Sequence, residues 1–482
     1  MTLLILIITP LAASLILAFI GNRRFAPEIN IFCSMLTFTA GIALALDVYR
    51  NGQIITGEKF FFVDAFSVYL TVLTSFVSMT TAVFSLRYMQ REREHGRVGR
   101  RRMRFYHAMF QLFIFAMLLC LLANNIGVLW IAMELATLST VLLVSLYRTP
   151  NAIEAAWKYF ILCGVGISQA LFGTVLLYFA AEKIIGEGGE ALLWTNLIEV
   201  SGRLEPTILS LAFVFLVVGY GTKVGLVPLH NWLPDAHSEG PTPISAVLSG
   251  LLLNVALYAL VRFKVLVDGS THTHYAGNIM MGFGIVSMLV ASFSILRQRD
   301  IKRMFSYSSI EHMGIATFAF GLGGSIATFG ALLHMLMHSL TKSSIFFTVG
   351  HTCQMHQTQE IAKIKGLFKG DPFVGWTLMF GSMAIAGMPP FGIFTSEFLI
   401  LTAAIKDVPM LVPFILIGLV AAFAGLLRKV QYMVTGDVPS YSKSIQAARA
   451  PVILHMSLVL ILAFYIPNFL NKWFQTAVEL LK

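Results

Sequence analysis

Charged residues are scarce along this chain. Asp, Glu, Lys and Arg together make up 12% of its 482 residues, about half of the ~25% that is usual in soluble domains. Apolar residues make up 57%, and they form repeated runs of roughly 20 residues, the length that crosses a bilayer as a helix. These proportions exclude a soluble globular protein. They indicate an all-α, polytopic membrane protein with no soluble domain.

Cysteines are also few, and they do not form a ligand motif. The four cysteines fall in or beside apolar runs, and no two of them make a Cys-x-x-Cys pair. Metal and Fe–S sites usually need such closely spaced pairs, whereas an isolated cysteine behaves as a small buried side chain. We therefore expect the chain to bind no metal ion, haem or other cofactor.

A removable signal peptide is not expected either. The first apolar run has no basic residue before it and no small-residue cleavage site after it, so we interpret it as the first membrane span. Reading along the chain predicts about fourteen spans, at 2–20, 29–49, 66–86, 106–123, 126–147, 153–180, 207–235, 243–266, 276–296, 303–321, 325–350, 372–404, 411–432 and 450–470.

Basic residues gather in the loops on one side of these spans. They include eight arginines within 87–104, and further Lys and Arg residues at 297–303, 363–369 and 443–449. The positive-inside rule places these loops in the cytoplasm, and an even number of spans then places both termini on the outer side of the cell's inner membrane. We interpret the net charge of +10 as a topology determinant that contacts anionic lipid or a cytoplasmic partner, and not as a nucleic-acid site.

Two of the predicted spans contain a helix break beside an ionisable residue. Lys223 precedes Pro228, and Glu397 follows Pro389 in the stretch GMPPFG. Proline cannot donate a backbone hydrogen bond and so interrupts a helix. Paired interrupted spans in two halves of a chain indicate a repeated transporter core with its site near the midplane.

This symmetry predicts the division of the chain. We expect two inverted five-helix repeats at 106–266 and 276–432, with broken helices at Pro228 and Pro389. An N-terminal segment of three helices and a basic loop, 1–105, precedes them, and a C-terminal helix lies within 433–482. The symmetry is imperfect, because the ionisable residue precedes the break in one copy and follows it in the other.

Several ionisable residues fall at membrane depth. They are Glu134, Lys223, His312, His334, His338, Lys342 and Glu397. A charged side chain there costs roughly 3 to more than 10 kcal/mol, so it is a functional candidate by default. Their order along the chain fits groups that pass a proton between them. A Glu134–Lys223 pair would switch the lysine between charged and neutral as the pair opens and closes.

Other interpretations stand beside this one. The Glu134–Lys223 pair could be a purely structural ion pair, and His334 could be a hydrogen-bonded core residue. His334 and His338 share a helix face, as a metal or haem ligand pair would, but haem more plausibly needs histidines on facing helices, and no second such pair is present. We place His312 near a helix start, and His230 and His237 at the rim of a cytoplasmic mouth. We place Asp64 outside the membrane. Near span ends, where long side chains reach water, we place Glu154, Lys158, Asp300 and Glu311.

Four segments resemble motifs of one known family. They are KVGLVPLHNWLPDAHSEGPTPISAVLSG (223–250), RDIKRMFSYSSIEHMG (299–314), HSLTKSSIFF (338–347) and GMPPFGIFTSEFLIL (387–401). In this order they resemble the proton-translocating antiporter-like family, which includes the large M, N and L-like membrane subunits of respiratory complex I, the subunits of multisubunit Mrp-type cation/proton antiporters and the membrane arms of energy-converting hydrogenases. Residues 124–149 and 154–183 are most similar to its hydrogenase-4 component F branch.

The resemblance implies roles for individual residues. Glu134 takes the position of a fifth-span glutamate, and Lys223 that of the lysine which it modulates. His338 and Lys342 fall where a central hydrophilic axis crosses the second repeat. Glu397 falls at a terminal site that holds lysine in many relatives, including the antiporters. Some relatives carry an eighth-span lysine where this chain has Asn254, which can hydrogen-bond a water wire but cannot hold a proton.

The resemblance also implies a function. We expect a non-catalytic, proton-translocating subunit of an energy-converting [NiFe] hydrogenase or complex I-like redox complex, in which hydrogenase or dehydrogenase partner subunits transfer the electrons. The alternative is a subunit of a multisubunit Na⁺/H⁺ antiporter. A membrane redox subunit that binds haem or quinone would be a different class of protein.

Overall fold

The computed structural model describes residues 2–440, 442 and 448–481 and is almost entirely helical. Lys443, which belongs to the basic stretch 443–449, lies outside the described residues. The α-helices are α1 (Thr2–Ile20), α2 (Ala26–Asn51), α3 (Ala65–Glu94), α4 (Arg100–Leu122), α5 (Ile126–Val144), α6 (Pro150–Ile185), α7 (Trp194–Val200), α8 (Pro206–Val224), α9 (Trp232–Glu239), α10 (Thr242–Val247), α11 (Leu253–Thr271), α12 (Tyr275–Arg297), α13 (Ile301–Leu322), α14 (Gly324–His356), α15 (Leu367–Gly370), α16 (Pro372–Ile385), α17 (Gly392–Asp407), α18 (Val412–Val434), α19 (Arg449–Phe464) and α20 (Asn468–Leu480). A π-helical turn, η4 (Leu248–Leu252), joins α10 to α11, and the strands β1 (Ile54–Thr56) and β2 (Phe61–Val63) form a small antiparallel hairpin. Short 3-10 turns are η1 (Ser145–Tyr147), η2 (Gly189–Leu192), η3 (Ser201–Arg203), η5 (Ile361–Lys363) and η6 (Pro409–Leu411).

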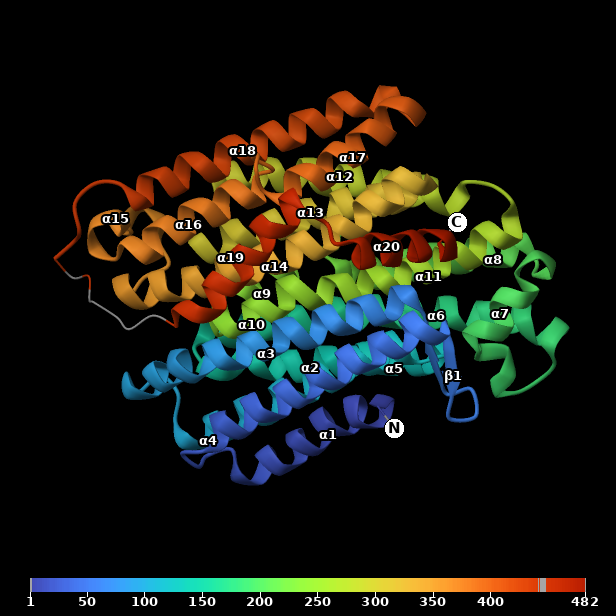
Figure 1. The fold of residues 1–482 in the computed structure, drawn as a ribbon, viewed down its shortest axis with the longest axis horizontal. Helices are drawn as coiled ribbons and strands as arrows, with labels where there is room; N and C mark the ends of the chain where they lie inside the picture. The colour runs from blue at the N-terminus through green and yellow to red at the C-terminus, as the bar shows by residue number, and fades with distance from the viewer. Residues whose placement is uncertain (1, 441, 443–447, 482) are drawn as a thin grey trace.

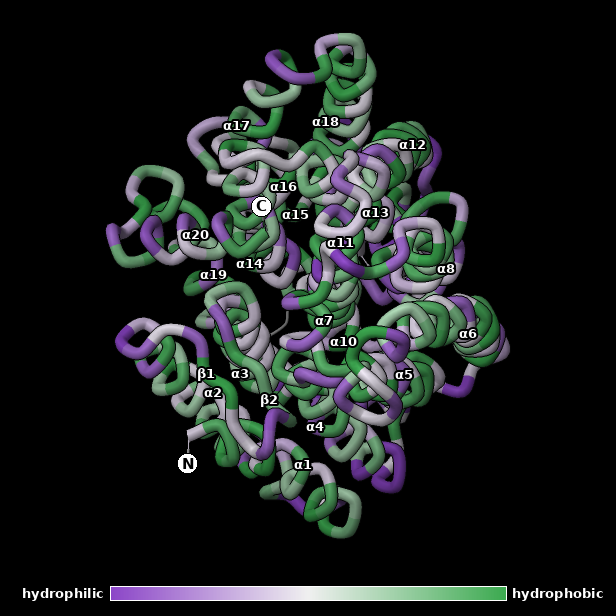
Figure 2. Tube along the Cα trace, turned by 90° about the vertical axis from the view of Figure 1, so that its right-hand side faces the viewer, coloured by the Kyte–Doolittle hydropathy of each residue, from purple (hydrophilic) through white to green (hydrophobic). Residues whose placement is uncertain are grey.

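The long helices lie side by side along the long axis of the molecule (Figure 1). Helices α1 to α6 form one side of the bundle. Helices α12, α13 and α15 to α18 form the other side, and α11 and α14 lie between the two. The apolar stretch of the continuous segment from α10 to α11 is completely buried, whereas only 28% of the apolar stretch of α18 is buried. Outer helices such as α18 and α6 therefore expose hydrophobic side chains, as a membrane protein must (Figure 2).

Ten helices among the described residues are long and apolar enough to cross a membrane, or eleven if the bent pair α19–α20 is one span. Helices α13 and α14, which carry the candidate-site histidines and Lys342, are not among these ten. The shorter helices α16 and α17 are not among them either. The all-α polytopic class is confirmed. The count of fourteen and the pairing of the helices into two inverted repeats stay predictions.

The basic loops meet at one end of the bundle. Arg97, between α3 and α4, donates a hydrogen bond to Gln357 after α14 (2.8 Å), and Arg102 donates to the carbonyl of Tyr147 after α5 (3.1 Å). The described ends of the chain, at α1 and α20, lie toward the opposite end (Figure 1). This arrangement agrees with the charge pattern. Which end faces the cytoplasm stays a prediction.

The predicted break at Pro228 is present. Helix α8 ends at Val224, Gly225 takes a left-handed conformation (φ 85°), and helical structure resumes only at Trp232. The backbone groups freed by the break find partners inside the protein. The Trp232 indole donates to the carbonyl of Thr222 (2.8 Å), and the Val227 amide donates to Ser287 Oγ (2.9 Å). An interrupted helix is tolerated at membrane depth because such groups are satisfied internally.

The second predicted break separates α16 from α17. Helix α16 ends at Ile385 and α17 begins at Gly392, with Gly387 in a left-handed conformation (φ 67°). A Cβ atom at Gly387 would collide with the Glu397 carboxylate. Glycine is therefore required at this point both by the backbone conformation and by the close approach of the acid.

Asp64, which the sequence places outside the membrane, is a buried residue with a structural role. Asp64 is 1% exposed, caps the N-terminus of α3 through a reciprocal pair of hydrogen bonds with Ser67, and accepts a hydrogen bond of 2.6 Å from Arg262 on α11. The Arg262 guanidinium also lies 4.9–5.6 Å from four aromatic ring centres, a cation–π arrangement. Although burial alone raises the pKa of the Asp64 carboxyl, the charge and hydrogen bond of Arg262 hold that pKa below its usual value.

Asp64→Asn is expected to destabilise the protein strongly. The substitution leaves Arg262 as a buried charge without its counter-ion, and breaking such a pair costs roughly 3–5 kcal/mol. The measurement is the thermal unfolding of the detergent-purified protein at constant pH. Lys59→Gln is the matched control, because it breaks an ion pair with Glu190 (3.1 Å) whose side chains are 50% and 59% exposed. Such exposed pairs contribute about 0–1 kcal/mol. Equal melting temperatures for the two variants would contradict a stabilising role of the buried pair.

Candidate functional site

The first cluster of intramembrane charge lies between α5 and α8. Lys223 Nζ is 3.7 Å from Glu134 Oε2 and donates a hydrogen bond to Thr137 Oγ1. The lysine side chain is fully buried, while that of Glu134 is 22% exposed. The Lys–Glu separation exceeds the usual hydrogen-bond range of about 2.7–3.2 Å, so a hydroxyl is the direct partner of the lysine. The predicted pair is brought together, and it is loose enough to open.

Close packing of α8 on α6 positions this lysine. A Cβ atom at Gly219 would lie 2.5 Å from the Cβ of Ala170, and one at Gly166 would lie 2.8 Å from Thr222. Small residues at both faces allow two helices in a membrane to approach closely. The end of α8 that carries Lys223 is therefore fixed against its neighbour, immediately before the break at Gly225. A cation in the last turn of a helix is also favoured by the helix dipole.

Asn254 lies between the two halves of the molecule. Its side-chain amide donates hydrogen bonds to Ser339 Oγ (2.7 Å) and to the carbonyls of Gly250 and Met335 (3.3 Å each). The residue follows the π-helical turn η4, a distortion that is frequent at functional sites. Buried hydroxyls at Ser308, Thr341 and Ser343 have no hydrogen-bond partner among the described residues. Buried polar groups without protein partners are usually satisfied by water.

Lys342 lies near the middle of α14 and is fully buried. Its ammonium donates a hydrogen bond to the carbonyl of Phe305 on α13 (2.7 Å). The Phe305 ring lies beneath it, 5.7 Å from Nζ. The carboxylate of Glu311, on the neighbouring helix α13, lies within electrostatic range of this ammonium. Lys342 is thus a second buried lysine with a backbone oxygen as its direct partner.

Three histidines and Glu397 form the last cluster. His312 Nδ1 and His334 Nε2 lie 3.1 Å apart, and the His338 ring centre is 5.5 Å from that of His312. The same atom, His312 Nδ1, is 3.9 Å from Glu397 Oε1. His334 Nδ1 is within 2.9 Å of the hydroxyl of Ser396. The structure thus brings together four predicted site residues from α13, α14 and α17.

This geometry corrects two placements and adds a residue. His312 and Glu311 lie at the middle of α13, with 1% and 2% of their surface exposed, so His312 is not near a helix start and Glu311 is not near a span end. The Glu311 carboxylate lies within electrostatic range of Glu397 and Lys342. Its position halfway along the predicted span 303–321 was the signal that could have identified it. The remaining three residues placed near span ends, Glu154, Lys158 and Asp300, do lie at helix ends.

The haem alternative finds no support in the placement of His334 and His338. His334 has both ring nitrogens within hydrogen-bond distance of other side chains, and its helix face is directed at His312 and Ser396. His338 packs beside the same group. These histidines are therefore part of a connected polar cluster rather than a pair that faces an open pocket.

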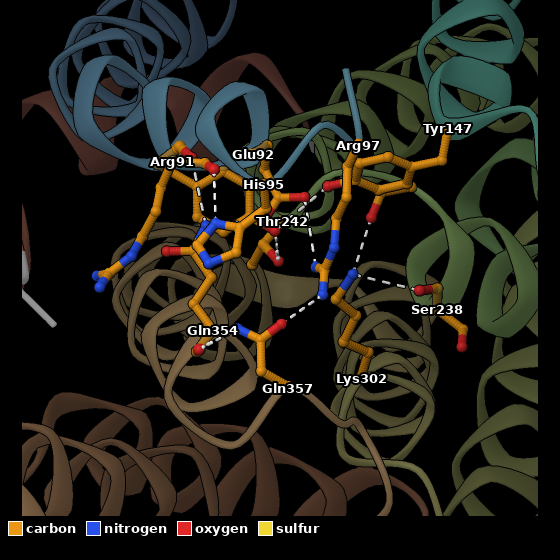
Figure 3. A network of polar contacts seen from close by, with 12 residues as sticks. Arg91, Glu92, His95, Arg97, Tyr147, Ser238, Thr242, Lys302, Gln354 and Gln357 are labelled. Carbon is orange, nitrogen blue, oxygen red and sulfur yellow. Dashed lines mark hydrogen bonds and ion pairs between the residues drawn. The ribbon is translucent and has the colours of Figure 1, made fainter. Parts of the chain in front are cut away.

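A polar cavity of about 360 Å³ opens at the end of the bundle that carries the basic loops. Its lining includes Tyr88, Arg97, Tyr147, Glu239, Lys302 and Gln354. Figure 3 shows the surrounding network, in which buried Glu92 accepts from Gln354 (2.8 Å) and lies 3.5 Å from Arg97. Lys302 donates to the carbonyls of Ser238 (3.2 Å) and Gly240 (2.8 Å).

His237 lies behind this cavity and not at its rim. It is fully buried, its ring stacks on Phe346 with centres 5.0 Å apart, and it is within electrostatic range of both Lys302 and Lys342. The expected rim position is therefore wrong for His237, because helix α9 turns this side chain inward. His230 is 8% exposed and lies beside Tyr307.

Comparison with known proteins gives consistent similarities. Residues 123–424 match the family described as NADH:quinone oxidoreductase/Mrp antiporter, transmembrane. The chain is 47% identical to the hydrogenase-4 component F homolog of Methylacidiphilum infernorum (isolate V4), over 99% of each sequence. It is 29% identical to NADH-quinone oxidoreductase subunit M of Pseudomonas aeruginosa, over 74% of this chain and 69% of that protein. Its fold is similar to a chain of the membrane-bound sulfane sulfur reductase, an archaeal respiratory membrane complex, with a TM-score of 0.89 at 23% identity, covering 99% of this chain and 97% of that chain.

Proposed function

Because the chain belongs to the NADH:quinone oxidoreductase/Mrp antiporter transmembrane family, we propose that it is the proton-translocating membrane subunit of an energy-converting complex. Similarity to a hydrogenase-4 component F homolog over the whole chain supports a [NiFe] hydrogenase-type assembly. The observation that carries the proposal is the series of buried ionisable side chains across the bundle, from Lys223 on α8 through Lys342 on α14 to Glu397 on α17.

The first step in this proposal is a switch at Lys223. While Glu134 is near, its negative charge stabilises the ammonium form of the lysine. When the pair separates, the ammonium remains fully buried with the neutral Thr137 hydroxyl as its hydrogen-bond partner. A cation without a counter-charge in a low-dielectric interior is strongly disfavoured, so the lysine releases its proton. Opening and closing of one ion pair thus becomes uptake and release of one proton.

Passage between the halves would use water and hydroxyl groups. Asn254 cannot hold a proton, but its amide and the neighbouring Ser339 hydroxyl are 2.7 Å apart. Further buried hydroxyls, such as that of Ser343, have no hydrogen-bond partner among the described residues. Lys342 is the next group that can hold a proton. The cluster of His312, His334 and Glu397 then connects it to the break between α16 and α17.

The energy would come from electron transfer in partner subunits. Moving one proton against 100 mV costs roughly 2.3 kcal/mol. We propose no redox cofactor for this subunit, so the energy has to come from elsewhere in the complex. We propose soluble hydrogenase or dehydrogenase subunits as electron-transferring partners, and neighbouring membrane subunits and lipid as contacts of the apolar outer helices. The basic loops would face the cytoplasm from the inner membrane, with both termini outside and two five-helix repeats at 106–266 and 276–432.

A Na⁺/H⁺ antiporter subunit is the second candidate, since the family description includes the Mrp antiporters. Glu397 favours the first candidate, because the family resemblance implies a lysine at this position in the antiporters. The two are distinguished by transport measurements in vesicles that contain the assembled complex. Proton uptake driven by the electron donor and independent of Na⁺ supports the redox-linked subunit, whereas proton movement that requires a Na⁺ gradient supports the antiporter.

Lys223→Ala is expected to reduce proton transport at least tenfold while the complex remains assembled, because the variant loses the group that holds the proton. Transport is measured as pH change in vesicles, after assembly has been checked by size-exclusion chromatography. Lys158→Ala is the control: Lys158 lies at the surface in ion pairs with Glu154 and Asp235, and this variant is expected to transport normally. Undiminished transport by Lys223→Ala would exclude the switch.

Glu397→Gln is expected to block net proton transfer, since an amide cannot accept and release a proton at this site. Glu397→Lys is expected to retain more transport than Glu397→Gln, because an amine can carry a proton where the carboxyl did. Electron transfer in the partner subunits, measured with an artificial acceptor, should remain detectable in both variants. A fully active glutamine variant would make Glu397 a structural acid and would leave Lys342 and His338 as the candidates for the exit.

Glu311→Gln is expected to slow proton transfer at least tenfold if this buried acid passes protons between Lys342 and Glu397. Glu311→Asp keeps a carboxyl group on a shorter side chain and should recover part of the rate. Glutamine keeps the shape of the side chain but cannot titrate, whereas aspartate titrates but is shorter, so the comparison separates titration from packing. A glutamine variant with the wild-type rate would show that the carboxyl group is not used.

A further inference from the structure

His312, His334 and Glu397 present ligand atoms to one point inside the protein. One donor atom from each residue lies within 4.8 Å of the other two, and all three side chains are buried. His312 Nδ1 is 3.1 Å from His334 Nε2 and 3.9 Å from Glu397 Oε1. Glu397 Oε1 has no hydrogen-bond partner among the described residues. An unpartnered carboxylate oxygen is thus directed at two imidazole nitrogens that come from two other helices.

We propose that these three residues form a binding site for a divalent transition-metal ion of the Zn²⁺ class. Two imidazoles and one carboxylate are ligands that Zn²⁺ accepts, and a three-ligand set leaves a fourth position for water. Nitrogens held about 2.0–2.1 Å from Zn²⁺ in a tetrahedral site lie roughly 3.3 Å apart, close to the observed 3.1 Å. The Glu397 oxygen, now 3.9 Å from His312 Nδ1 and within 4.8 Å of His334 Nε2, has to move closer to both nitrogens to complete the set.

Ser396 prepares one of the ligands. Its hydroxyl lies 2.9 Å from His334 Nδ1, and it also donates to the carbonyl of Ile393 (2.8 Å). Since the hydroxyl hydrogen is directed at Ile393, its oxygen accepts the proton carried by Nδ1. The lone pair of His334 then lies on Nε2, the atom directed at His312. Partners of this kind fix the tautomer and orientation of metal-binding histidines, and their loss typically weakens metal affinity by about 10–100-fold.

The donor set also decides which ions the site takes. Imidazole nitrogen suits Zn²⁺, Co²⁺, Ni²⁺ and Cu²⁺, whereas Na⁺ and Mg²⁺ prefer oxygen ligands. The site is therefore not the one expected for a transported sodium ion. The break between α16 and α17 lies beside the site: Gly387 closely approaches the Glu397 carboxylate, and the following Pro389 and Pro390 are exposed.

Occupancy of the site has a consequence that rests on the proposed function. A metal ion bound to these nitrogens and to the carboxylate occupies the atoms that would carry the proton between Lys342 and the helix break. Binding displaces any proton held there, so affinity falls as the pH falls. Zn²⁺ is thereby an inhibitor of proton translocation, and protons compete with it for the same three side chains.

The experiment is a titration of the purified complex with Co²⁺, followed by the visible absorption of four-coordinate Co²⁺ and reversed by Zn²⁺. The assembled wild-type complex is expected to bind one Co²⁺ per copy of this chain at the site. His312→Gln, His334→Gln and Glu397→Gln are each expected to weaken this binding at least tenfold, and Ser396→Ala by 10–100-fold through His334 alone. His338→Gln is the matched control, because it removes an equally buried histidine one turn away on α14 and should keep the wild-type spectrum.

The outcomes separate this site from the proton relay. Absence of the Co²⁺ spectrum in the wild type, its persistence in all three ligand variants, or its loss in His338→Gln would each overturn the proposed ligand set, whatever proton transport shows. Size-exclusion chromatography of every variant identifies loss of assembly, and binding by Ser396→Ala provides a test that keeps all three ligands. Co²⁺ binding with the expected variant pattern but without inhibition of proton transport by Zn²⁺ would support the site and instead contradict the relay.

Discussion

Burial of charge is the constraint on which this structure depends. A lysine or glutamate inside a membrane protein is stable only where a counter-charge, a hydroxyl or a backbone carbonyl replaces the water that it has lost. The two buried lysines of the candidate proton pathway meet that requirement in different ways. Lys223 has a hydroxyl as its direct partner and a carboxylate slightly farther away, whereas Lys342 has a backbone carbonyl. Neither is held in a tight, fully satisfied ion pair, and a loosely held proton is one that can be moved.

The helix breaks supply what regular helices cannot. An intact helix uses its own carbonyls and amides, and offers only side chains to a buried charge. At Gly225 and at Gly387 the chain leaves the helix beside Lys223 and Glu397, respectively. In the first break the freed groups are bonded within the protein. In the second, the turn brings the acid against the backbone and near His312. The two breaks therefore differ: one fixes the end of a helix, and the other places a buried acid beside a turn of the backbone.

The sequence predicted the elements of this site better than their surroundings. The motif residues and both breaks could be identified because prolines, glycines and charges are conspicuous in an apolar chain. Glu311 and His237 were misplaced, since burial within a helical bundle depends on which neighbours cover a residue and not on its distance from a span end. Asp64 was missed for the same reason: its partner Arg262 is far away in the sequence, and only the packing of α11 against α3 brings the two together. The convergence of His312, His334 and Glu397 likewise depends on three helices at once.

The gap at Asn254 constrains how the two halves can be coupled. A titrating lysine at that point would let a proton rest between Lys223 and Lys342, but an amide offers only hydrogen bonds. Its partners, Ser339 Oγ and two backbone carbonyls, leave the Asn254 carbonyl oxygen buried without a partner among the described residues. That oxygen can orient a water molecule, and the nearby hydroxyls of Ser343 and Thr341 can continue the chain. Under the proposed function, transfer across the middle would therefore use ordered water and hydroxyl groups, with Lys342 as the next group that can hold the proton released by Lys223.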